Sequence, residues 1–272
     1  MKMSNLAVRL ITAAVFVPLL LLLLYRGPAW GLYLLILPAS LIGTYELVGM
    51  THRDDRISQA IALVLATGAS LALYCGHDAR WPLTVLAVVP VLGPVLTLFR
   101  LGDMKTAALR AITMSVAPLF VAAPLCWLAI IRRDVAHGAS YVVMTLMFAW
   151  FSDTGGYFAG RFLGKRKLYE AVSPKKTIAG AFGGLGGSVV GALLAHFWFL
   201  PSIPLWHAVP LALVAGALGQ AGDLGESLLK RSTGVKDSGA IVPGHGGILD
   251  RIDALILTST VVYLYTLWNN TT

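Results

Sequence analysis

Charged residues are scarce in this sequence, and their scarcity excludes an ordinary soluble domain. Only 12% of the 272 residues are Asp, Glu, Lys or Arg, while 57% are hydrophobic, and soluble domains carry about 25% charged residues. Apolar stretches of ~20 residues, the length that crosses a bilayer as a helix, recur along the chain. The composition therefore predicts an all-α, polytopic integral membrane protein.

Cysteine and acidic residues are also few. Cys75 and Cys126 both lie in apolar stretches, where we expect small, buried hydrophobic side chains rather than a disulfide framework or a metal site. The chain has 13 acidic residues against 21 Lys and Arg, a net charge of +8. This balance suits an anionic lipid surface and a polyphosphate ligand. No basic stripe with interleaved aromatic residues is present, so nucleic acid is not expected as a partner.

Hydropathy predicts about nine transmembrane helices, with boundaries good to a few residues. They are expected at 8–25, 29–50, 58–75, 81–99, 112–131, 138–160, 177–200, 206–227 and 248–268. Residues 1–135 hold mostly apolar spans with short loops and read as lipid-embedding helices. Residues 136–272 hold most of the glycines, basic loops and acids, and we expect the catalytic region there.

The distribution of basic residues predicts the orientation of these spans. Placing the N-terminus in the cytoplasm puts all but four of the 21 Lys and Arg residues on the cytoplasmic side. The four on the opposite side are Arg26, Arg80, Arg132 and Arg133. So strong a bias follows the positive-inside rule, and it places the polar motifs of the C-terminal region at the cytoplasmic face.

The eighth predicted span carries the first group of polar residues. Its polar stripe falls on one helical face and consists of Gln220, Asp223, Glu226, Ser227 and Lys230. A carboxylate at the bilayer edge needs a partner, a cation or water. Asp223 is therefore expected to hold a metal ion, with a structural ion pair to a Lys or Arg as the alternative.

A second group surrounds the start of the ninth span. Gly244–Gly247, with His245 among them, precede a helix whose first turn carries Asp250 and Asp253 on one face. Glycine-rich backbone at a helix N-terminus is suited to phosphate binding. Capping of the helix by the two acids is the simpler alternative.

Two further stretches precede these motifs. Residues 151–161 include Asp153 and Arg161, and residues 173–177 read Ser-Pro-Lys-Lys-Thr just before a predicted helix start. The Lys175–Lys176 pair suits phosphate binding at that position, with positive-inside anchoring as the alternative. Lys165, Arg166 and Lys167 read as anchoring residues.

Residues 227–253 resemble the C-terminal motif of the phosphatidate cytidylyltransferases (CDP-diacylglycerol synthases), with Val242 where Leu, Ile or Phe is expected. Residues 151–161 and 173–177 are similar to the family patterns that precede this motif. One departure is clear: after Lys-Thr the family commonly has Trp-Glu-Gly, and this chain has Ile178-Ala179-Gly180. Any role of the Glu missing at position 179 is either absent or supplied by another residue, with Glu170 and Glu226 as the candidates.

The resemblance implies that CTP and phosphatidate give CDP-diacylglycerol and pyrophosphate at the cytoplasmic face of a bacterial inner membrane. It implies Mg²⁺ held by Asp223 and Asp250, allows a second, monovalent cation such as K⁺, and leaves a homodimer open. The residues expected to be catalytic are Asp223, Lys236, Asp237, His245, Asp250 and Arg251. Those expected to bind substrate are Asp153, Arg161, Ser173, Lys175, Lys176, Thr177, Ser227, Lys230, Arg231, Gly246, Gly247 and Asp253.

Two other functions share parts of this pattern. A CTP-dependent polyprenol kinase would use the same nucleotide in a membrane, but its substrate would attack the γ-phosphorus. A secondary transporter would also have intramembrane acids and glycine-broken helices, but would not need a charged cluster at one membrane face.

Glu46 is an isolated acid within the second predicted span. We expect it to lie at a subunit interface or in a structural pairing, with completion of the site or lipid-headgroup binding as alternatives.

Overall fold

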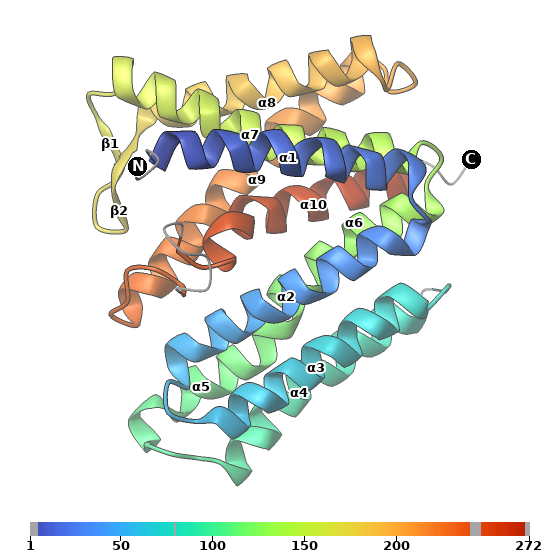
Figure 1. The fold of residues 1–272 in the computed structure, drawn as a ribbon. Helices are drawn as coiled ribbons and strands as arrows, with labels where there is room; N and C mark the ends of the chain where they lie inside the picture. Colours follow the sequence, from blue (N-terminus) through green and yellow to red (C-terminus); the bar gives the residue numbers. More distant parts are fainter. Residues whose placement is uncertain (1–4, 79, 240–245, 270–272) are drawn as a thin grey trace.

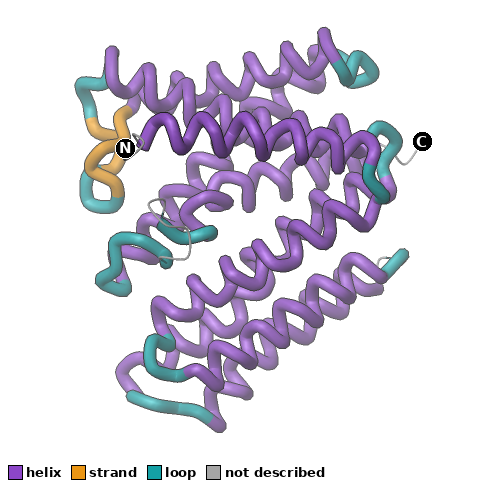
Figure 2. The backbone as a smooth tube through the Cα atoms, in the orientation of Figure 1, coloured by secondary structure: helices purple, strands orange, loops and turns teal. Residues whose placement is uncertain are grey.

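The computed structural model describes residues 5–78, 80–239 and 246–269. In these residues the chain is helical apart from a short hairpin and loops (Figures 1 and 2). The helices are α1 (Asn5–Arg26), α2 (Ala29–Thr51), α3 (Arg56–Cys75), α4 (Arg80–Phe99), α5 (Met104–Ala117), the π-helical turn η1 (Pro118–Ala122), α6 (Ala123–Asp134), α7 (Gly138–Leu163), α8 (Ile178–Trp198), α9 (Leu205–Ser232) and α10 (Leu249–Asn269).

Each predicted span corresponds to a helical segment, because α5, η1 and α6 run on as one stretch. Within the described residues, six segments are long and apolar enough to cross a membrane: α2, α3, α4, the stretch Met104–Asp134, α8 and α9. The chain is thus an integral membrane protein, while nine crossings stay a prediction. The stretch Met104–Asp134 begins before the predicted start of the span at 112. Asp103 caps the start of this helix, because its carboxylate accepts a hydrogen bond from Lys105 N at 3.0 Å.

The π-helical turn has a local cause. Pro118 has no N–H to donate to the preceding turn, and the backbone widens into η1 there before α6 resumes at Ala123. Cys126 in α6 is buried as predicted, whereas Cys75, the last residue of α3, is exposed, so that part of the expectation is wrong. Cys75 ends its helix next to a loop, where neighbouring helices do not cover it.

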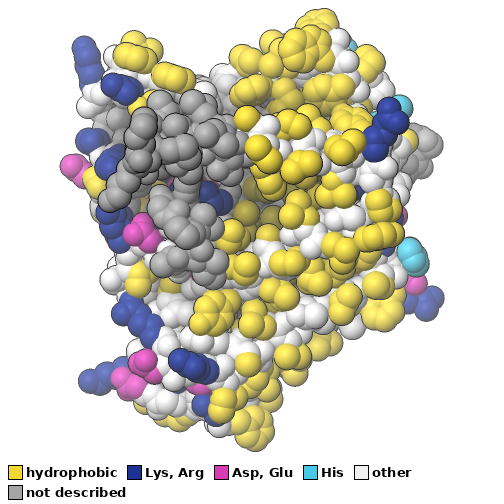
Figure 3. Space-filling view, viewed as in Figure 1, with side chains coloured by type: hydrophobic (Ala, Val, Ile, Leu, Met, Phe, Trp, Pro, Cys, Tyr) yellow, Lys and Arg dark blue, Asp and Glu magenta, His cyan; other side chains and the backbone are white. Residues whose placement is uncertain are grey.

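The helices form two groups that share α6 and α10 as their contact. Helices α7, α8, α9 and α10 pack on one another, helices α2 to α5 do the same, and α6 lies against α2, α7 and α10 (Figure 1). The basic side chains seen in Figure 3 gather mainly at one end of the molecule, with smaller clusters at the opposite end and hydrophobic side chains between. This distribution matches a protein whose middle lies in lipid.

A two-stranded hairpin is the element that the sequence did not predict. Strands β1 (Lys167–Tyr169) and β2 (Ser173–Thr177) pair antiparallel, with Lys167 opposite Thr177 (Figure 2). Thr177 then caps α8, because its hydroxyl accepts a hydrogen bond from Gly180 N at 3.1 Å. The hairpin carries Lys175 and Lys176 to the end of the α7–α10 group.

An ion cluster joins the loops of the N-terminal group. The Asp55 carboxylate accepts hydrogen bonds from Arg100 at 2.8 Å, from Arg110 at 2.7 Å and from Ser58 N at 3.1 Å, which caps α3. Burial by itself would raise the pKa of Asp55, but the hydrogen bonds from Arg100 and Ser58 outweigh it and hold that pKa below its ordinary value. The cluster ties the start of α3 to the end of α4 and to α5.

Helices α7 and α8 approach closely because glycines face each other between them. A Cβ at Gly187 would overlap Phe151 O, and one at Gly155 would overlap Gly183 O. Small residues at such contacts let backbones come together in membranes. By contrast, Gly186 on α8 has open space where a Cβ would go.

We therefore expect Gly187→Ala to destabilise the protein by about 1–3 kcal/mol, since the added methyl group must push α7 and α8 apart. Gly186→Ala is the matched control and should be neutral or stabilising by up to ~1 kcal/mol, because alanine favours helix more than glycine. Unfolding in detergent, followed by circular dichroism, measures both. Equal midpoints for the two variants would show that this close approach is not what holds the helices.

Candidate active site

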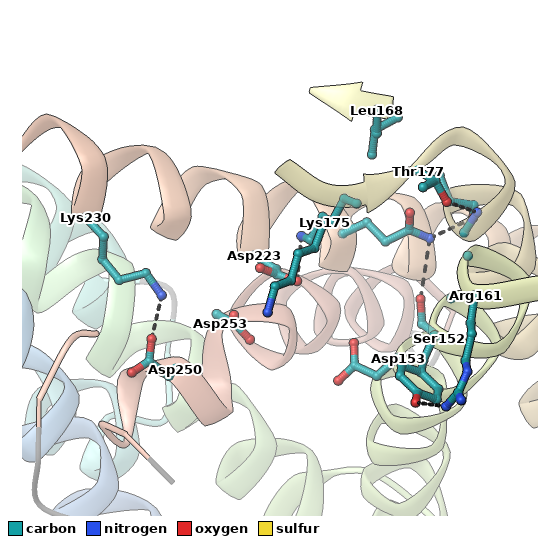
Figure 4. A pocket seen from close by; sticks show the side chains of 17 residues that line it. Ser152, Asp153, Arg161, Leu168, Lys175, Thr177, Asp223, Lys230, Asp250 and Asp253 are labelled. Atoms are coloured by element: carbon teal, nitrogen blue, oxygen red, sulfur yellow. Dashed lines mark hydrogen bonds and ion pairs between the residues drawn. The ribbon is translucent and has the colours of Figure 1, made fainter. Parts of the chain in front are cut away.

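A cavity of about 650 Å³ opens where the hairpin meets α7, α8, α9 and α10 (Figure 4). Its volume falls in the range of small-molecule sites, roughly 300–1,000 Å³. Its lining consists of Ser152, Asp153, Gly156, Tyr157, Gly160, Arg161, Leu168, Lys175, Lys176, Thr177, Gly180, Ala181, Gln220, Asp223, Lys230, Asp250 and Asp253. Residues from all four polar groups predicted from the sequence thus meet at one place.

The charges of the lining are balanced. Four basic side chains, Arg161, Lys175, Lys176 and Lys230, face four carboxylates, Asp153, Asp223, Asp250 and Asp253. With all eight groups ionised, their formal charges cancel. A lining without net charge does not by itself neutralise an anionic ligand.

Helix α9 presents the predicted polar stripe to the cavity. Gln220, Asp223 and Lys230 all line it, as their helical spacing predicts. The Gln220 amide donates to Ala181 O at 3.1 Å and so links α9 to α8. Glu226, on the same helix, is 1% exposed and pairs with Lys230 at 3.2 Å.

Asp223 has a basic partner from the hairpin. Its Oδ2 lies 2.6 Å from Lys176 Nζ, and both side chains are about a quarter exposed. The ion pair that the sequence allowed as an alternative is therefore present. Asp253 on α10 lies beside Asp223 in Figure 4, close enough for their charges to repel.

Asp250 holds several groups at the start of α10. Its Oδ1 pairs with Lys230 Nζ at 2.5 Å, and its Oδ2 accepts hydrogen bonds from Gly247 N at 2.9 Å and from Ser238 N at 3.1 Å. The bond from Gly247 is a helix cap, so the capping alternative holds for this acid. Capping leaves Oδ1 directed at the cavity and the lysine (Figure 4).

The donor set suits a divalent cation of the Mg²⁺ type. Carboxylate oxygens are its preferred protein ligands, and it is usually bound by one or two carboxylates plus substrate phosphates rather than by an all-protein cage. No group of three or more His, Cys, Asp or Glu side chains forms such a cage in the part of the chain that the structure describes. Asp223 and Asp250 fit the arrangement with one or two carboxylates. Each has an oxygen paired with a lysine, and an anionic phosphate would attract that lysine and so free the oxygen for a cation.

The remaining predicted residues divide into three sets. Asp153, Arg161, Lys175 and Thr177 line the cavity, and Arg161 donates to the Tyr157 hydroxyl at 2.8 Å. His245, like Val242, lies outside the described residues. Eight others are described but do not line the cavity: Ser173, Ser227, Arg231, Lys236, Asp237, Gly246, Gly247 and Arg251.

Two of these eight residues still contribute near the site. Arg251 is close enough to Asp153 to interact with its charge, and Gly247 donates to Asp250. Of the two candidates to replace the missing Glu at 179, Glu226 lies against Lys230, whereas Glu170 is exposed in the hairpin turn. Glu226 is therefore the candidate that lies beside a lining residue, and its replacement of the missing Glu stays a prediction.

Several lining residues were not predicted as site residues. They are Ser152, Gly156, Tyr157, Gly160, Leu168, Gly180, Ala181 and Gln220. Gln220 had a signal, because it belongs to the polar stripe of α9. The glycines lie where α7 and α8 approach closely, a property that sequence alone does not separate from ordinary helix packing.

The comparisons with known proteins agree with this geometry. Residues 7–268 match the Cytidylyltransferase family. A phosphatidate cytidylyltransferase of Staphylococcus aureus (strain COL) is 32% identical over 258 residues, which cover 92% of this chain and 94% of that protein.

Two shorter matches have higher identity. A phosphatidate cytidylyltransferase of Staphylococcus epidermidis (strain ATCC 12228 / FDA PCI 1200) is 43% identical over 121 residues, or 44% of this chain and 46% of the relative. One of Brucella suis biovar 1 (strain 1330) is 42% identical over 139 residues, 51% of each chain. The chain thus spans about half the length of these two relatives. Since the family match extends over nearly the whole sequence, the chain belongs to the cytidylyltransferase family.

Proposed function

We propose that this protein is a phosphatidate cytidylyltransferase, which joins CTP and phosphatidate into CDP-diacylglycerol with release of pyrophosphate. The family and the name carried by its relatives give the reaction class, a nucleotidyl transfer in phospholipid biosynthesis. The observation that carries the proposal is the cavity where β2, α7, α9 and α10 bring four basic and four acidic side chains together.

The chemistry requires little beyond positioning and charge. An oxygen of the lipid phosphate attacks the α-phosphorus of CTP, and the bond from that phosphorus to the bridging oxygen of the β-phosphate breaks. Pyrophosphate leaves with the electron pair. A phosphate monoester is largely ionised near neutral pH, so the attacking oxygen needs no strong general base.

The lysines and arginine of the cavity screen the two anionic substrates from each other. Lys176 pairs with Asp223 and Lys230 pairs with Asp250, and the oxygens of a bound phosphate would offer these lysines charge-assisted hydrogen bonds instead. Turning toward phosphate would release the two carboxylates. Mg²⁺ held by these carboxylates would neutralise charge on the triphosphate and the leaving pyrophosphate. A second, monovalent cation such as K⁺ stays a prediction from the family resemblance.

The proposed orientation has the N-terminus and the cavity at the cytoplasmic face. The asymmetry of basic residues supports it, as does the need for CTP to arrive from the cytosol. Residues 136–272 form the catalytic region in this proposal, and all lining residues fall within them. Residues 1–135 are assigned to lipid embedding, and a homodimer stays a prediction.

The test is the fate of the phosphates of CTP. With purified protein, phosphatidate in mixed micelles and Mg²⁺, label on the α-phosphate should enter a lipid product, and label on the γ-phosphate should leave as pyrophosphate. Label from the γ-phosphate appearing in lipid, with release of CDP, would contradict the proposal and indicate a kinase.

A further inference from the structure

Glu46 is a buried acid in the N-terminal group of helices whose partners lie in the C-terminal region. It is 4% exposed on α2. Its Oε1 accepts a hydrogen bond from Ile248 N at 3.1 Å, and its Oε2 accepts one from Leu249 N at 2.8 Å. These are backbone N–H groups at the start of α10, which have no acceptor within their own helix. The expectation of a structural pairing for Glu46 is thus confirmed, and its partner is a helix end.

The same carboxylate is linked to Asp250 by one hydroxyl. Ser238 Oγ lies 3.1 Å from Glu46 Oε2 and 2.9 Å from Asp250 Oδ2. Ser238 N also donates to Asp250. Glu46 from α2 and Asp250 from α10 therefore hold the segment at Ser238 between them, with the hydroxyl proton available to one carboxylate at a time.

Glycines on both sides make room for this arrangement. A Cβ at Gly239 would overlap the Glu46 carboxylate, and a Cβ at Gly247 would overlap both Ser238 Oγ and Glu46. Gly247 was predicted to bind substrate. Its contacts give it another role, which is to let the Glu46 carboxylate reach the backbone of α10.

We infer that Glu46 is a positioning residue for cytidylyl transfer. It fixes the first turn of α10 and, through Ser238, the Asp250 carboxylate at the cavity, with Asp253 one turn further on. The inference rests on the proposed function, since it gives Glu46 a role through Asp250. A buried carboxylate costs free energy unless strong hydrogen bonds compensate it, and here those bonds hold the helix start and the Ser238 hydroxyl next to Asp250, the residue expected to hold the cation.

Glu46→Gln is the main variant. The amide keeps the shape of the side chain, but its NH₂ group faces one of the two backbone N–H groups and cannot accept from it. Loss of a residue that orients a metal ligand lowers metal affinity or activity roughly 10–100-fold. We expect the half-saturating Mg²⁺ concentration for turnover to rise by about that factor. The dissociation constant of CTP with Mg²⁺, measured by calorimetry in detergent, should rise with it.

Asp55→Asn is the matched control. Asp55 is also an acid of the N-terminal group, caps a helix and accepts hydrogen bonds from several groups, but these join α3, α4 and α5 rather than the site. We expect its unfolding midpoint to fall while kcat, KM for CTP and the Mg²⁺ requirement stay at wild-type values. A purely structural Glu46 would behave in the same way.

Ser238→Ala keeps the inference testable if Glu46→Gln does not fold, because it removes the linking hydroxyl without leaving a charge. It should raise the Mg²⁺ requirement by about 3–10-fold, the effect of one lost hydrogen bond. A wild-type Mg²⁺ requirement and CTP affinity in folded Glu46→Gln would overturn the inference, as would wild-type values in Ser238→Ala if the first variant is unfolded.

Asp250→Asn, measured alongside, tests the proposed function. Full activity of this variant would overturn the assignment of the site itself. An inactive Asp250→Asn beside a normal Glu46→Gln would overturn only the role of Glu46.

Discussion

Asp223→Asn should lower turnover by about 10²- to 10³-fold while leaving the protein folded. The loss of one group that stabilises charge in the transition state costs roughly 10²–10³-fold, and Asp223 is expected to act on the triphosphate through the divalent cation. The asparagine keeps the shape of the side chain but loses its charge. Activity is measured by transfer of label from CTP to lipid, and folding by the thermal unfolding midpoint in detergent.

The Lys176–Asp223 ion pair gives Asp223 an alternative, purely structural role. If Asp223 serves only to pair with Lys176, at 2.6 Å, the variant should lose stability and keep its turnover. Removing both partners should then be no worse than removing one, because the interaction is already lost. Asp54→Asn is the control, since Asp54 is exposed in the loop between α2 and α3. Near-normal turnover of Asp223→Asn at ordinary Mg²⁺ would contradict the assignment.

Lys176→Ala should lower kcat/KM by roughly 30- to 10³-fold. This factor corresponds to about 2–4 kcal/mol of lost transition-state stabilisation, the range for a lost charge-assisted donor in a catalytic site. The side chain lines the cavity and reaches Asp223 from β2. It is therefore within the cavity, where a bound phosphate could replace Asp223 as its partner. Steady-state kinetics with varied CTP and fixed phosphatidate measure the effect.

Arg166→Ala separates this local effect from surface charge. Arg166 is exposed just before β1 and does not line the cavity. Its replacement removes the same formal charge from the same end of the molecule, and the variant should stay within about 2-fold of the wild type, as expected for an exposed charge. Equal losses at Arg166 and Lys176 would mean that basic residues act only by attracting anionic lipid.

The helices could be predicted from sequence because apolar stretches of bilayer length rarely occur outside membrane-spanning helices. The predicted start at 177 is within one residue of α8, where Thr177 provides a local cap. The hairpin was missed because β1 has three residues and β2 is Ser-Pro-Lys-Lys-Thr, with no alternation of polar and apolar side chains. The early start of α5 was missed because its first turns are amphipathic rather than apolar.

The site was predicted in its residue types more than in its contacts. Asp223 was recognised because a carboxylate at the bilayer edge needs a partner, and Asp250 and Lys176 because they lie at predicted helix starts suited to phosphate binding. The pairing of Lys176 with Asp223 depends on how β2 meets α9, which no local pattern encodes. Glu46 illustrates the limit, since its backbone partners at Ile248 and Leu249 are about 200 residues away and carry no side-chain signal.

The central claim is that the cavity at the hairpin end binds the nucleotide. The most direct measurement is an experimental structure of the protein with CTP and Mg²⁺, stabilised against turnover by omitting phosphatidate. We expect the triphosphate to lie in the cavity, with Lys176 turned from Asp223 to a phosphate oxygen and the metal beside Asp223 and Asp250. A triphosphate bound elsewhere, with the Lys176–Asp223 and Lys230–Asp250 pairs intact, would contradict the account.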